Sequence, residues 1–385
     1  MISQFKHVKI KGISVVVPQK EINIYDEAEY YDNSIKKIDR MRKMVGFYKR
    51  RVVEDGTTAS DLAIQAAKQL IQDMNIDINS IDSLVYVNQR PDFKQPATSF
   101  CIHNKLGLSS KCSVLDINHG CPGWMYGLWT ASSIIESKSC KRILLLVGDT
   151  PSAGMDLSNR ISAPVFGDGG CATLLEFNES EWNSYFDIST FSDGFEAIMT
   201  PAGGARLPLN IKNIDNDFNK KLLKPIKTKA GHETTLFSGY MDGLAVFDFT
   251  INKVPESIKK LMEFAKVTEQ DIDKLMLHQA NKQIVQAVGQ SAGFSLDKVP
   301  YDAFENYGNN TMCSIPTNLT YLYTNKMDSK KKFICSGFGN GLAVVSGYLE
   351  IDKNIYLSGV KNYKKPADYV SKEEYLEYWI KKLEG

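Results

Sequence analysis

The sequence predicts an internally duplicated α/β fold, and two pairs of similar segments are the main evidence. Residues 57–89 and 251–279 each begin with apolar residues at helical spacing and end in a short apolar run, IDSLVYVNQ in the first and IDKLMLHQ in the second. A second pair, FGDGGCATLLE at 166–176 and FGNGLAVVSGYLE at 338–350, places a glycine turn before an apolar strand. Both pairs occur in the same order, which makes chance similarity a poor explanation.

The apolar runs are continuous rather than alternating, as is typical of strands buried on both faces. Strands of this kind alternate with amphipathic helices, so we expect sheets covered by helices on both faces. The 385 residues then divide into an N-terminal half at 1–185 and a C-terminal half at 235–351, packed as one unit. A polar linker or insertion at 186–234 separates them, and an extension at 352–385 ends in a short amphipathic helix.

Composition and charge narrow the class of protein. The chain has 43% hydrophobic and 24% charged residues with a net charge of +1, which gives no indication of nucleic-acid binding. No signal peptide follows Met1, and no apolar run approaches the roughly 18 residues of a membrane span, so we expect a cytoplasmic protein without membrane contact. The seven cysteines lack a CxxC pair and the five histidines lack ligand spacing, which predicts reduced thiols and no metal site.

Cys121 is the first candidate for chemistry because it lies at a glycine-flanked corner. A predicted buried strand, VLDIN at 114–118, is followed by GCPG at 120–123 and then by an apolar helix. Pro122 suits a first helical turn. A helix N-terminus is expected to lower the pKa of the thiol, and its N–H groups could receive an oxyanion. The alternative is a small core residue, and the flanking glycines alone leave the two interpretations about equally open.

Two further candidates lie in the C-terminal half. His278 ends the apolar run KLMLH, where open α/β folds keep their sites, although for a lone histidine of this kind we would favour a core residue. The segment ENYGNNTMCSIPTNL at 305–319 is expected to turn tightly into a helix. Its asparagines could donate amide hydrogen bonds to an enolate or could simply favour the turn. The other histidines are interpreted as structural residues: His7, His103, His119 and His232.

Six motifs in order resemble the β-ketoacyl-acyl-carrier-protein synthase III family of the thiolase superfamily. GFYKRRVVEDGTTASDLAIQAA resembles an N-terminal family segment, and NHGCPG stands where the family has its A-C-x-G nucleophile corner. FGDGGCATLL is nearly F-G-D-G-A-G-A, and HQAN is identical to the histidine motif. YGNNTMCSIP matches G-N-T-S-A-A-S-V-P, and FGNG matches F-G-G-G. The resemblance covers the chain to about residue 351.

The resemblance implies a thiolase fold, an internally duplicated five-layer α-β-α-β-α arrangement, in a homodimer. It implies a ping-pong acyltransferase: an acyl thioester acylates Cys121, and a malonyl-type thioester on CoA or acyl carrier protein then loses carbon dioxide and condenses with the acyl group. By motif, His278 and Asn309 hydrogen-bond the malonyl thioester carbonyl, and the backbone at Cys121, Gly339 and Asn340 forms the oxyanion hole. No metal or redox cofactor is implied. One histidine and one asparagine in the C-terminal half distinguish this branch from thiolases and from elongating ketosynthases.

The sequence departs from the family pattern at three positions. Pro122 follows the nucleophile, and Asn340 replaces a glycine beside the oxyanion hole. Gln95 stands where a bacterial member has a phenylalanine that reaches into the acyl pocket of its partner subunit, which weakens the expectation of an acetyl primer. These changes indicate a specialised relative in fatty acid or secondary metabolism, such as polyketide biosynthesis.

A basic segment from Lys36 to Arg51 contains eight Lys or Arg residues and one Asp. It could dock the phosphates of CoA or an acidic carrier protein, or it could be a solvated helix face. In the family this region lies near the mouth of the pantetheine tunnel. The residues expected to bind substrate or carrier are Arg40, Lys43, Arg50, Gln95, Asn281 and Lys282.

Two other functions stay open at this point. The first is acyl transfer from Cys121 to an oxygen or nitrogen nucleophile without decarboxylation. The second is a non-catalytic subunit that binds acyl carriers, against which the intact set of cysteine, histidine and asparagine argues.

Overall fold

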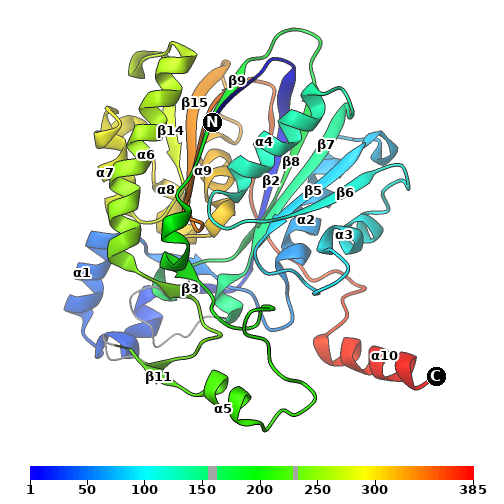
Figure 1. Cartoon of the computed structure of the whole chain (residues 1–385). Coiled ribbons are helices and arrows are strands. Elements are labelled where there is room, and N and C mark those ends of the chain that lie inside the picture. Colours follow the sequence, from blue (N-terminus) through cyan, green and yellow to red (C-terminus); the bar gives the residue numbers. More distant parts are fainter. Residues whose placement is uncertain (155–162, 229–232) are drawn as a thin grey trace.

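The computed structural model of this chain describes residues 1–154, 163–228 and 233–385. These residues form two mixed sheets with helices between them and on their outer faces (Figure 1). The predicted five-layer α/β arrangement is therefore observed. Residues 155–162 of the expected N-terminal half and 229–232 of the insertion, including His232, lie outside the described residues.

The N-terminal sheet has six strands in the order β17-β2-β8-β7-β5-β6. β5 pairs in parallel with β6 and β7, whereas β8 is antiparallel to both of its neighbours. Helices α2 (Ala59–Asp73) and α3 (Thr98–Leu106) cover its outer face. The strand bounds are β2 (Val8–Val17), β5 (Ser83–Asn88), β6 (Ser113–Asn118), β7 (Arg142–Asp149), β8 (Gly169–Phe177) and β17 (Tyr356–Asn362).

The C-terminal sheet has five strands in the order β1-β9-β16-β15-β14. β14 is parallel to β15, and the other pairs are antiparallel. Helices α6 (Gly243–Ala265) and α7 (Lys282–Ser291) cover its outer face. The strand bounds are β1 (Ile2–Phe5), β9 (Ser184–Thr190), β14 (Lys274–Leu277), β15 (Lys331–Gly339) and β16 (Ala343–Ile351).

Two helices fill the space between the sheets. α4 (Gly123–Glu136) and α9 (Ser314–Tyr323) contact strands of both sheets. A helix enclosed in this way needs apolar side chains on most of its surface, which explains the sequence GWMYGLWTASSIIE of α4. Buried side chains of both helices join the central core: Trp124, Met125, Leu128, Ile315 and Leu319.

The predicted duplication is confirmed by the positions of the repeated segments. α2 followed by β5 in the first half corresponds to α6 followed by β14 in the second. The FGDG and FGNG segments lead into β8 and β16. β8 pairs antiparallel with β7, and β16 pairs antiparallel with β15, so the two segments have equivalent positions in the two sheets.

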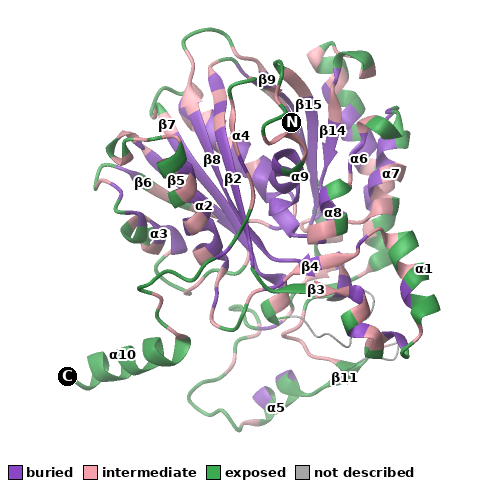
Figure 2. Cartoon of the chain, turned by 180° about the vertical axis from the view of Figure 1, so that it is seen from behind, coloured by how far each residue is buried: buried purple, intermediate pink, exposed green. Residues whose placement is uncertain are grey.

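The structure differs from the expected boundaries at both ends of the halves. The boundary at residue 185 falls within β9, which belongs to the C-terminal sheet together with β1. The extension after residue 351 is more than an added helix, because β17 completes the N-terminal sheet beside β2. Sequence similarity between the halves did not include these strands, so their exchange was not visible from the repeats. The final helix α10 (Lys372–Glu384) projects from the body and is exposed along its length (Figure 2).

The remaining elements are short or peripheral. In the described part of the chain, no helix combines the length and apolarity that crossing a membrane requires. The remaining bounds are α1 (Ile35–Val45), α5 (Asp217–Leu223), α8 (Asp302–Tyr307), β3 (Glu21–Asn23), β4 (Lys49–Arg51), β10 (Ile198–Met199), β11 (Ile226–Lys227), β12 (Glu233–Thr234) and β13 (Tyr240–Met241).

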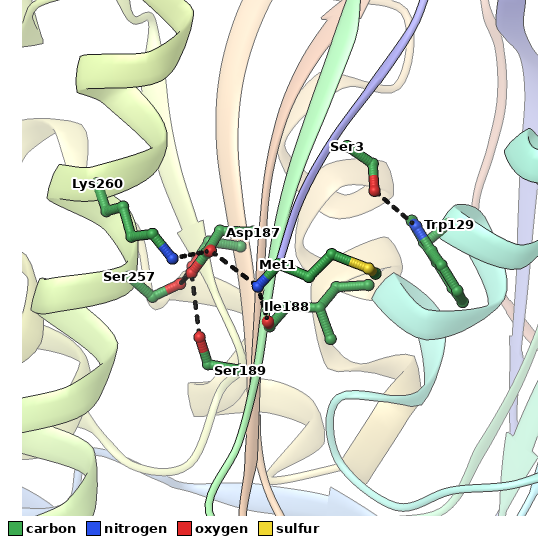
Figure 3. Close-up of polar contacts among 9 residues, drawn as sticks. Met1, Ser3, Trp129, Asp187, Ile188, Ser189, Ser257 and Lys260 are labelled. Atoms are coloured by element: carbon green, nitrogen blue, oxygen red, sulfur yellow. Dashed lines mark hydrogen bonds and ion pairs between the residues drawn. The ribbon is translucent and has the colours of Figure 1, made fainter.

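A buried carboxylate ties α6 to the C-terminal sheet. Asp187 on β9 is fully buried and accepts hydrogen bonds from Lys260 Nζ at 2.7 Å and Ser257 Oγ at 2.8 Å (Figure 3). Ser257 also bonds Ser346 at 2.9 Å, which in turn bonds Ser336 at 2.9 Å. Because an unpaired buried charge is costly, these partners explain how the sheet tolerates Asp187.

Candidate active site

Cys121 lies at the predicted strand-to-helix corner, between β6 and α4. β6 itself is a partly exposed edge strand, so the expectation of a buried strand there was wrong. Its glycine neighbours are required for close packing. A Cβ added to Gly120 would lie 2.9 Å from the Cβ of Asn340, and one added to Gly123 would lie 2.9 Å from Cγ1 of Val87. Larger residues at either position would therefore push the nucleophile corner away from the turn between β15 and β16 or from β5.

The turn between β15 and β16 touches the thiol directly. Gly339 has a φ of +139°, and a Cβ there would lie 3.3 Å from Sγ of Cys121. Hydrogen bonds from the backbone of Asn340 and of Cys121 itself reach the thiol and favour its charged form. Of the three residues expected to form an oxyanion hole, Cys121 and Asn340 thus direct backbone N–H groups at the sulfur, and Gly339 provides the close approach.

The pKa of the Cys121 thiol is raised, which corrects the expectation that the helix N-terminus lowers it. Burial is the main cause and the charge of Asp149 adds to it, so that the pKa reaches about 12 despite the opposing backbone hydrogen bonds and the charge of Arg90. Cys121 keeps partial exposure as a residue, but protein atoms surround its thiol. Desolvation therefore outweighs the N–H groups, and a base must remove the proton at neutral pH.

His278 follows β14 and is only 3% exposed. Its Nδ1 lies 2.8 Å from Oγ of Ser314, and the ring also hydrogen-bonds to the backbone of Thr311. Burial lowers the pKa of His278 to about 4, with the bond to Thr311 acting in the opposite direction. The imidazole is therefore neutral at neutral pH, and it can accept a proton or donate one hydrogen bond.

Asn309 presents a free amide donor. Its backbone is fixed by hydrogen bonds to Val165 at 2.7 Å and from Gly167 at 3.0 Å, and its Oδ1 accepts the N–H of Thr311 at 3.0 Å. Its Nδ2 makes no hydrogen bond to any residue that the structure describes. The next residue, Asn310, instead donates its Nδ2 to Thr317 at 2.8 Å and is buried in the core. Of the two asparagines, Asn309 is thus the one with a donor available for substrate.

Strand β15 brings the two halves of the site together. The backbone N–H of His278 donates to the carbonyl of Ser336 at 2.9 Å, and the His278 ring meets the edge of Phe338 with centroids 5.4 Å apart. The residue after Phe338 is Gly339, which contacts Cys121. His278 of the C-terminal half and the nucleophile of the N-terminal half therefore contact neighbouring residues of one strand.

Two residues that sequence reasoning left without a role hold this arrangement. Thr311 has a φ of +51°, which is unusual for a β-branched residue, and its backbone bonds both His278 and the Asn309 side chain. Ser314, the first residue of α9, bonds the His278 ring. Ser314 could have been identified from the sequence, because the match of YGNNTMCSIP to the family motif aligns Ser314 with a serine of that motif.

The residues expected to contact substrate or carrier have different environments. Arg40 and Lys43 are exposed on α1, and no ion pair engages them among the described residues. Arg50 is a correction, because it is 2% exposed and bonds both carboxylate oxygens of Glu27, at 2.7 and 2.5 Å. Its charge is therefore used inside the fold and is not available to a carrier.

The other three candidates lie at loops and at the start of α7. Gln95 is exposed in the loop before α3. Asn281 caps α7 by accepting the N–H of Ile284 at 2.8 Å, and Lys282 Nζ lies 5.0 Å from the centroid of the Tyr301 ring. Lys282 packs against the end of α1, since a Cβ on Gly46 would lie 2.5 Å from its Cβ. The end of α1 therefore lies beside the residue that follows the HQAN motif.

The FGDG motif contributes a buried carboxylate that fixes two backbone segments. Asp168 is buried and accepts hydrogen bonds from the backbone N–H of Val53 at 2.7 Å, the backbone N–H of Ser152 at 3.0 Å and the Ser152 hydroxyl. Burial raises its pKa to about 6. All seven cysteines are free, and within residues 1–154, 163–228 and 233–385 no group of His, Cys, Asp and Glu could hold a metal ion.

Comparison with known families and sequences gives a consistent result. The family described as 3-oxoacyl-[acyl-carrier-protein] synthase III matches residues 115–194, and its C-terminal counterpart matches residues 262–351. A Campylobacter jejuni protein provisionally named 3-oxoacyl-[acyl-carrier-protein] synthase 3 is 37% identical over 370 residues, covering 95% of this chain and 99% of the relative. A β-ketoacyl-[acyl-carrier-protein] synthase III from Streptococcus agalactiae is 30% identical, covering 87% of this chain and 96% of the relative.

Solved structures share the fold. A crystal structure of a 3-oxoacyl-(acyl-carrier protein) synthase from Burkholderia xenovorans superposes with a TM-score of 0.85 at 28% identity, covering 94% of this chain and 99% of the other. A priming β-ketosynthase from a polyketide biosynthetic pathway superposes with a TM-score of 0.76 at 19% identity, covering 90% of this chain and 97% of the other, a likeness of fold alone.

Proposed function

Because this chain belongs to the 3-oxoacyl-[acyl-carrier-protein] synthase III family of condensing acyltransferases, we propose that Cys121, His278 and Asn309 carry out its decarboxylative Claisen condensation. The observation that carries the assignment is that β15 contacts both the Cys121 thiol and the neutral His278 ring, and that the Thr311 backbone joins this ring to Asn309, whose Nδ2 has no partner among the described residues.

The first half-reaction acylates Cys121. The thiol, with a pKa near 12, gives its proton to neutral His278 as the sulfur attacks the thioester carbonyl of an acyl donor. The N–H groups of Cys121 and Asn340 stabilise the tetrahedral oxyanion. When the intermediate collapses, the donor C–S bond breaks, and His278 returns the proton to the leaving thiolate. The acyl group stays on Cys121.

The second half-reaction forms the carbon–carbon bond. A malonyl-type thioester loses carbon dioxide, and the electron pair of the broken bond moves onto its thioester carbonyl as an enolate. His278 and the Nδ2 of Asn309 donate hydrogen bonds to that oxygen as charge develops. The enolate carbon attacks the acyl thioester on Cys121, and the intermediate collapses to a β-ketoacyl thioester and the free thiol. This chemistry uses only the chain and its substrates, so we propose no metal or redox cofactor.

Partners follow from the same reaction. We propose acyl-CoA or acyl carrier protein as donor and acceptor carriers, guided by the exposed cations of α1.

A homodimer is supported by the exposed apolar edge of the N-terminal sheet. The edge strand β6 has Leu115 42% exposed, and the adjacent helix α3 has Phe100 56% exposed. Uncovered apolar edges of this kind favour pairing with a second chain. The reduced state that Cys121 requires supports a cytoplasmic location.

Incubation with a panel of acyl-CoAs followed by intact-mass analysis tests the proposal. One acyl group per chain is expected, and a malonyl thioester should then discharge it as a β-ketoacyl product. Discharge to an alcohol or amine, with no carbon dioxide released from any malonyl donor, would instead support simple acyl transfer with His278 as the base for the acceptor. Absence of any acyl adduct would favour a non-catalytic subunit.

A further inference from the structure

Three polar side chains lie at the nucleophile corner without a role in the reaction above. Gln89 and Arg90 follow β5, and Asp149 ends the neighbouring strand β7. Oε1 of Gln89 lies 3.0 Å from the position that a Cβ on Gly120 would take, and Gly120 directly precedes Cys121. Parallel pairing of β5 and β7 thus places the amide of Gln89 beside Gly120, and it holds Arg90 and Asp149 near enough for their charges to act on the Cys121 thiol.

These groups are fixed relative to one another. The Asp149 side chain is 0% exposed. It accepts Nε2 of Gln89 at 2.5 Å, Nη1 of Arg90 at 2.5 Å and the N–H of Thr150 at 3.0 Å. The charges of Arg90 and Asp149 offset each other, so the cluster is polar without a net charge. Such a network is rigid enough to select among substrates.

Hydrogen-bonding capacity remains on the accessible side of this network. Because Nε2 of Gln89 is committed to Asp149, its Oε1 is left as an acceptor, and it has no partner among the described residues. The Arg90 side chain is 41% exposed and only its Nη1 is engaged by residues that the structure describes, so its other N–H donors have no partner among those residues. Asn340, which also packs on Gly120, donates its Nδ2 to the carbonyl of Ile198 at 3.0 Å.

We propose that Gln89, Arg90 and Asp149 form a polar wall of the acyl site, and that the acyl group loaded onto Cys121 carries a neutral hydrogen-bonding substituent, such as a hydroxyl, a few bonds from the thioester carbon. This inference rests on the proposed acylation of Cys121. A hydroxyl can donate to Oε1 of Gln89 and accept from Arg90. A plain alkyl chain would exclude water from these groups and replace no hydrogen bond.

A carboxylated acyl group fits this wall less well. The positive charge of Arg90 is already matched by Asp149, and Oε1 of Gln89 would face the added carboxylate. A carboxylate and the amide oxygen of Gln89 would repel each other, because neither carries a hydrogen to share. The wall therefore selects a neutral polar substituent over both an alkyl and an anionic one.

Matched substrates that differ by one hydroxyl test the proposal. Loading of Cys121 from 3-hydroxybutyryl and butyryl thioesters, each as the CoA and the N-acetylcysteamine derivative, is followed by intact mass. In the wild-type protein we expect the hydroxylated group to load at least about tenfold faster in kcat/KM. Gln89→Leu and Arg90→Met should each reduce that ratio toward one. Gln290→Leu, at an exposed position on α7, is the control and should keep the wild-type ratio.

The outcomes separate this inference from the proposed function. Equal or faster loading of butyryl by the wild-type protein, or an unchanged ratio in both variants, would overturn the polar wall while acylation of Cys121 stands. Faster loading of succinyl than of 3-hydroxybutyryl would overturn the neutral substituent. If no thioester of either carrier loads Cys121, the proposed function fails, and the inference fails with it. Two variants are used because each removes a different partner of Asp149, which keeps the N–H of Thr150 and one side-chain hydrogen bond in either variant, so that one variant suffices if the other does not fold.

Discussion

The repeated glycine turns of the two halves occupy the same place in the fold but contribute differently to the site. In FGDG of the N-terminal half, the polar residue Asp168 is buried and its carboxylate ties the backbone at Val53 and Ser152. In FGNG of the C-terminal half, the polar residue Asn340 directs its backbone N–H at Cys121. Duplication thus provided two equivalent turns, one of which became a structural support and the other part of the reaction site.

The same division extends to the whole site. The N-terminal half supplies the nucleophile at a tight corner, where backbone N–H groups surround the sulfur. The C-terminal half supplies His278 and Asn309, both held by the backbone of Thr311. We therefore expect loss of Cys121 to stop acylation and loss of Asn309 to act mainly on decarboxylation, whereas His278 serves both half-reactions.

The largest effect is expected from removing the nucleophile. Cys121→Ala should abolish acyl loading, a loss on the order of a thousandfold or more, because no other group can form the acyl-enzyme. Peptide mapping after acyl-CoA treatment of the wild-type protein should place the added mass on Cys121. Cys140→Ala, at another partly exposed cysteine, is the matched control. An adduct on buried Cys313 or Cys171 would assign the chemistry elsewhere.

Removing the amide donor should separate the two half-reactions. Asn309→Ala should acylate Cys121 at a rate near that of the wild-type protein but release carbon dioxide from malonyl thioester about a hundredfold to a thousandfold more slowly, because one donor to the enolate is lost. Rapid-quench mass analysis and labelled carbon dioxide report the two steps. Asn252→Ala on the surface of α6 controls for the substitution itself. Equal slowing of both steps would contradict the assignment of Asn309 to the second half-reaction alone.

The pH dependence of acylation tests the role of His278 as the base in the first half-reaction. Between about pH 5 and 9 the wild-type rate should be nearly constant, because the thiol with a pKa near 12 stays protonated and the imidazole with a pKa near 4 stays neutral. His278→Ala must rely on free thiolate, whose fraction rises about tenfold per pH unit below the pKa. We expect a loss of about a hundredfold at pH 7 that diminishes as pH rises. A variant profile as flat as that of the wild-type protein would exclude His278 as the base.

The smallest effect is expected at Arg40 and Lys43, the exposed cations of α1 that we propose to guide the carrier. Arg40→Glu with Lys43→Glu should raise the apparent KM severalfold at low salt and weaken its dependence on ionic strength, because exposed charges are screened over about 8 Å at ~0.15 M salt. Lys259→Glu with Lys353→Glu, at exposed positions away from α1, imposes the same change in net charge. If both pairs behave alike, α1 is a solvated face rather than a docking surface.

Much of this arrangement was predictable from the sequence because it depends on local pattern. The repeats predicted the duplicated α/β halves, and the Gly-flanked cysteine and the HQAN motif predicted Cys121 and His278, which both contact β15. The catalytic roles of these residues and of Asn309 stay predictions. Two glycines that cannot accept a side chain explain why the corner around Cys121 was visible in the sequence.

The features that were missed depend on long-range packing. The pKa of Cys121 reflects how completely the fold surrounds the thiol, and Arg50 is buried because it meets Glu27, a residue 23 positions earlier. The strands β1, β9 and β17 exchange between the sheets through pairings that no local pattern encodes. Gln89 and Asp149 are 60 positions apart and meet only because β5 and β7 are neighbours.

Carbon dioxide release from the acylated wild-type protein tests the condensation most directly. Protein carrying one acyl group on Cys121 is mixed with a malonyl thioester labelled in its free carboxyl group, and labelled carbon dioxide and acyl occupancy are measured in the same turnover. We predict one carbon dioxide released for each acyl group discharged, with a β-ketoacyl thioester as product. Discharge of the acyl group to an alcohol or amine without any labelled carbon dioxide would contradict the condensation.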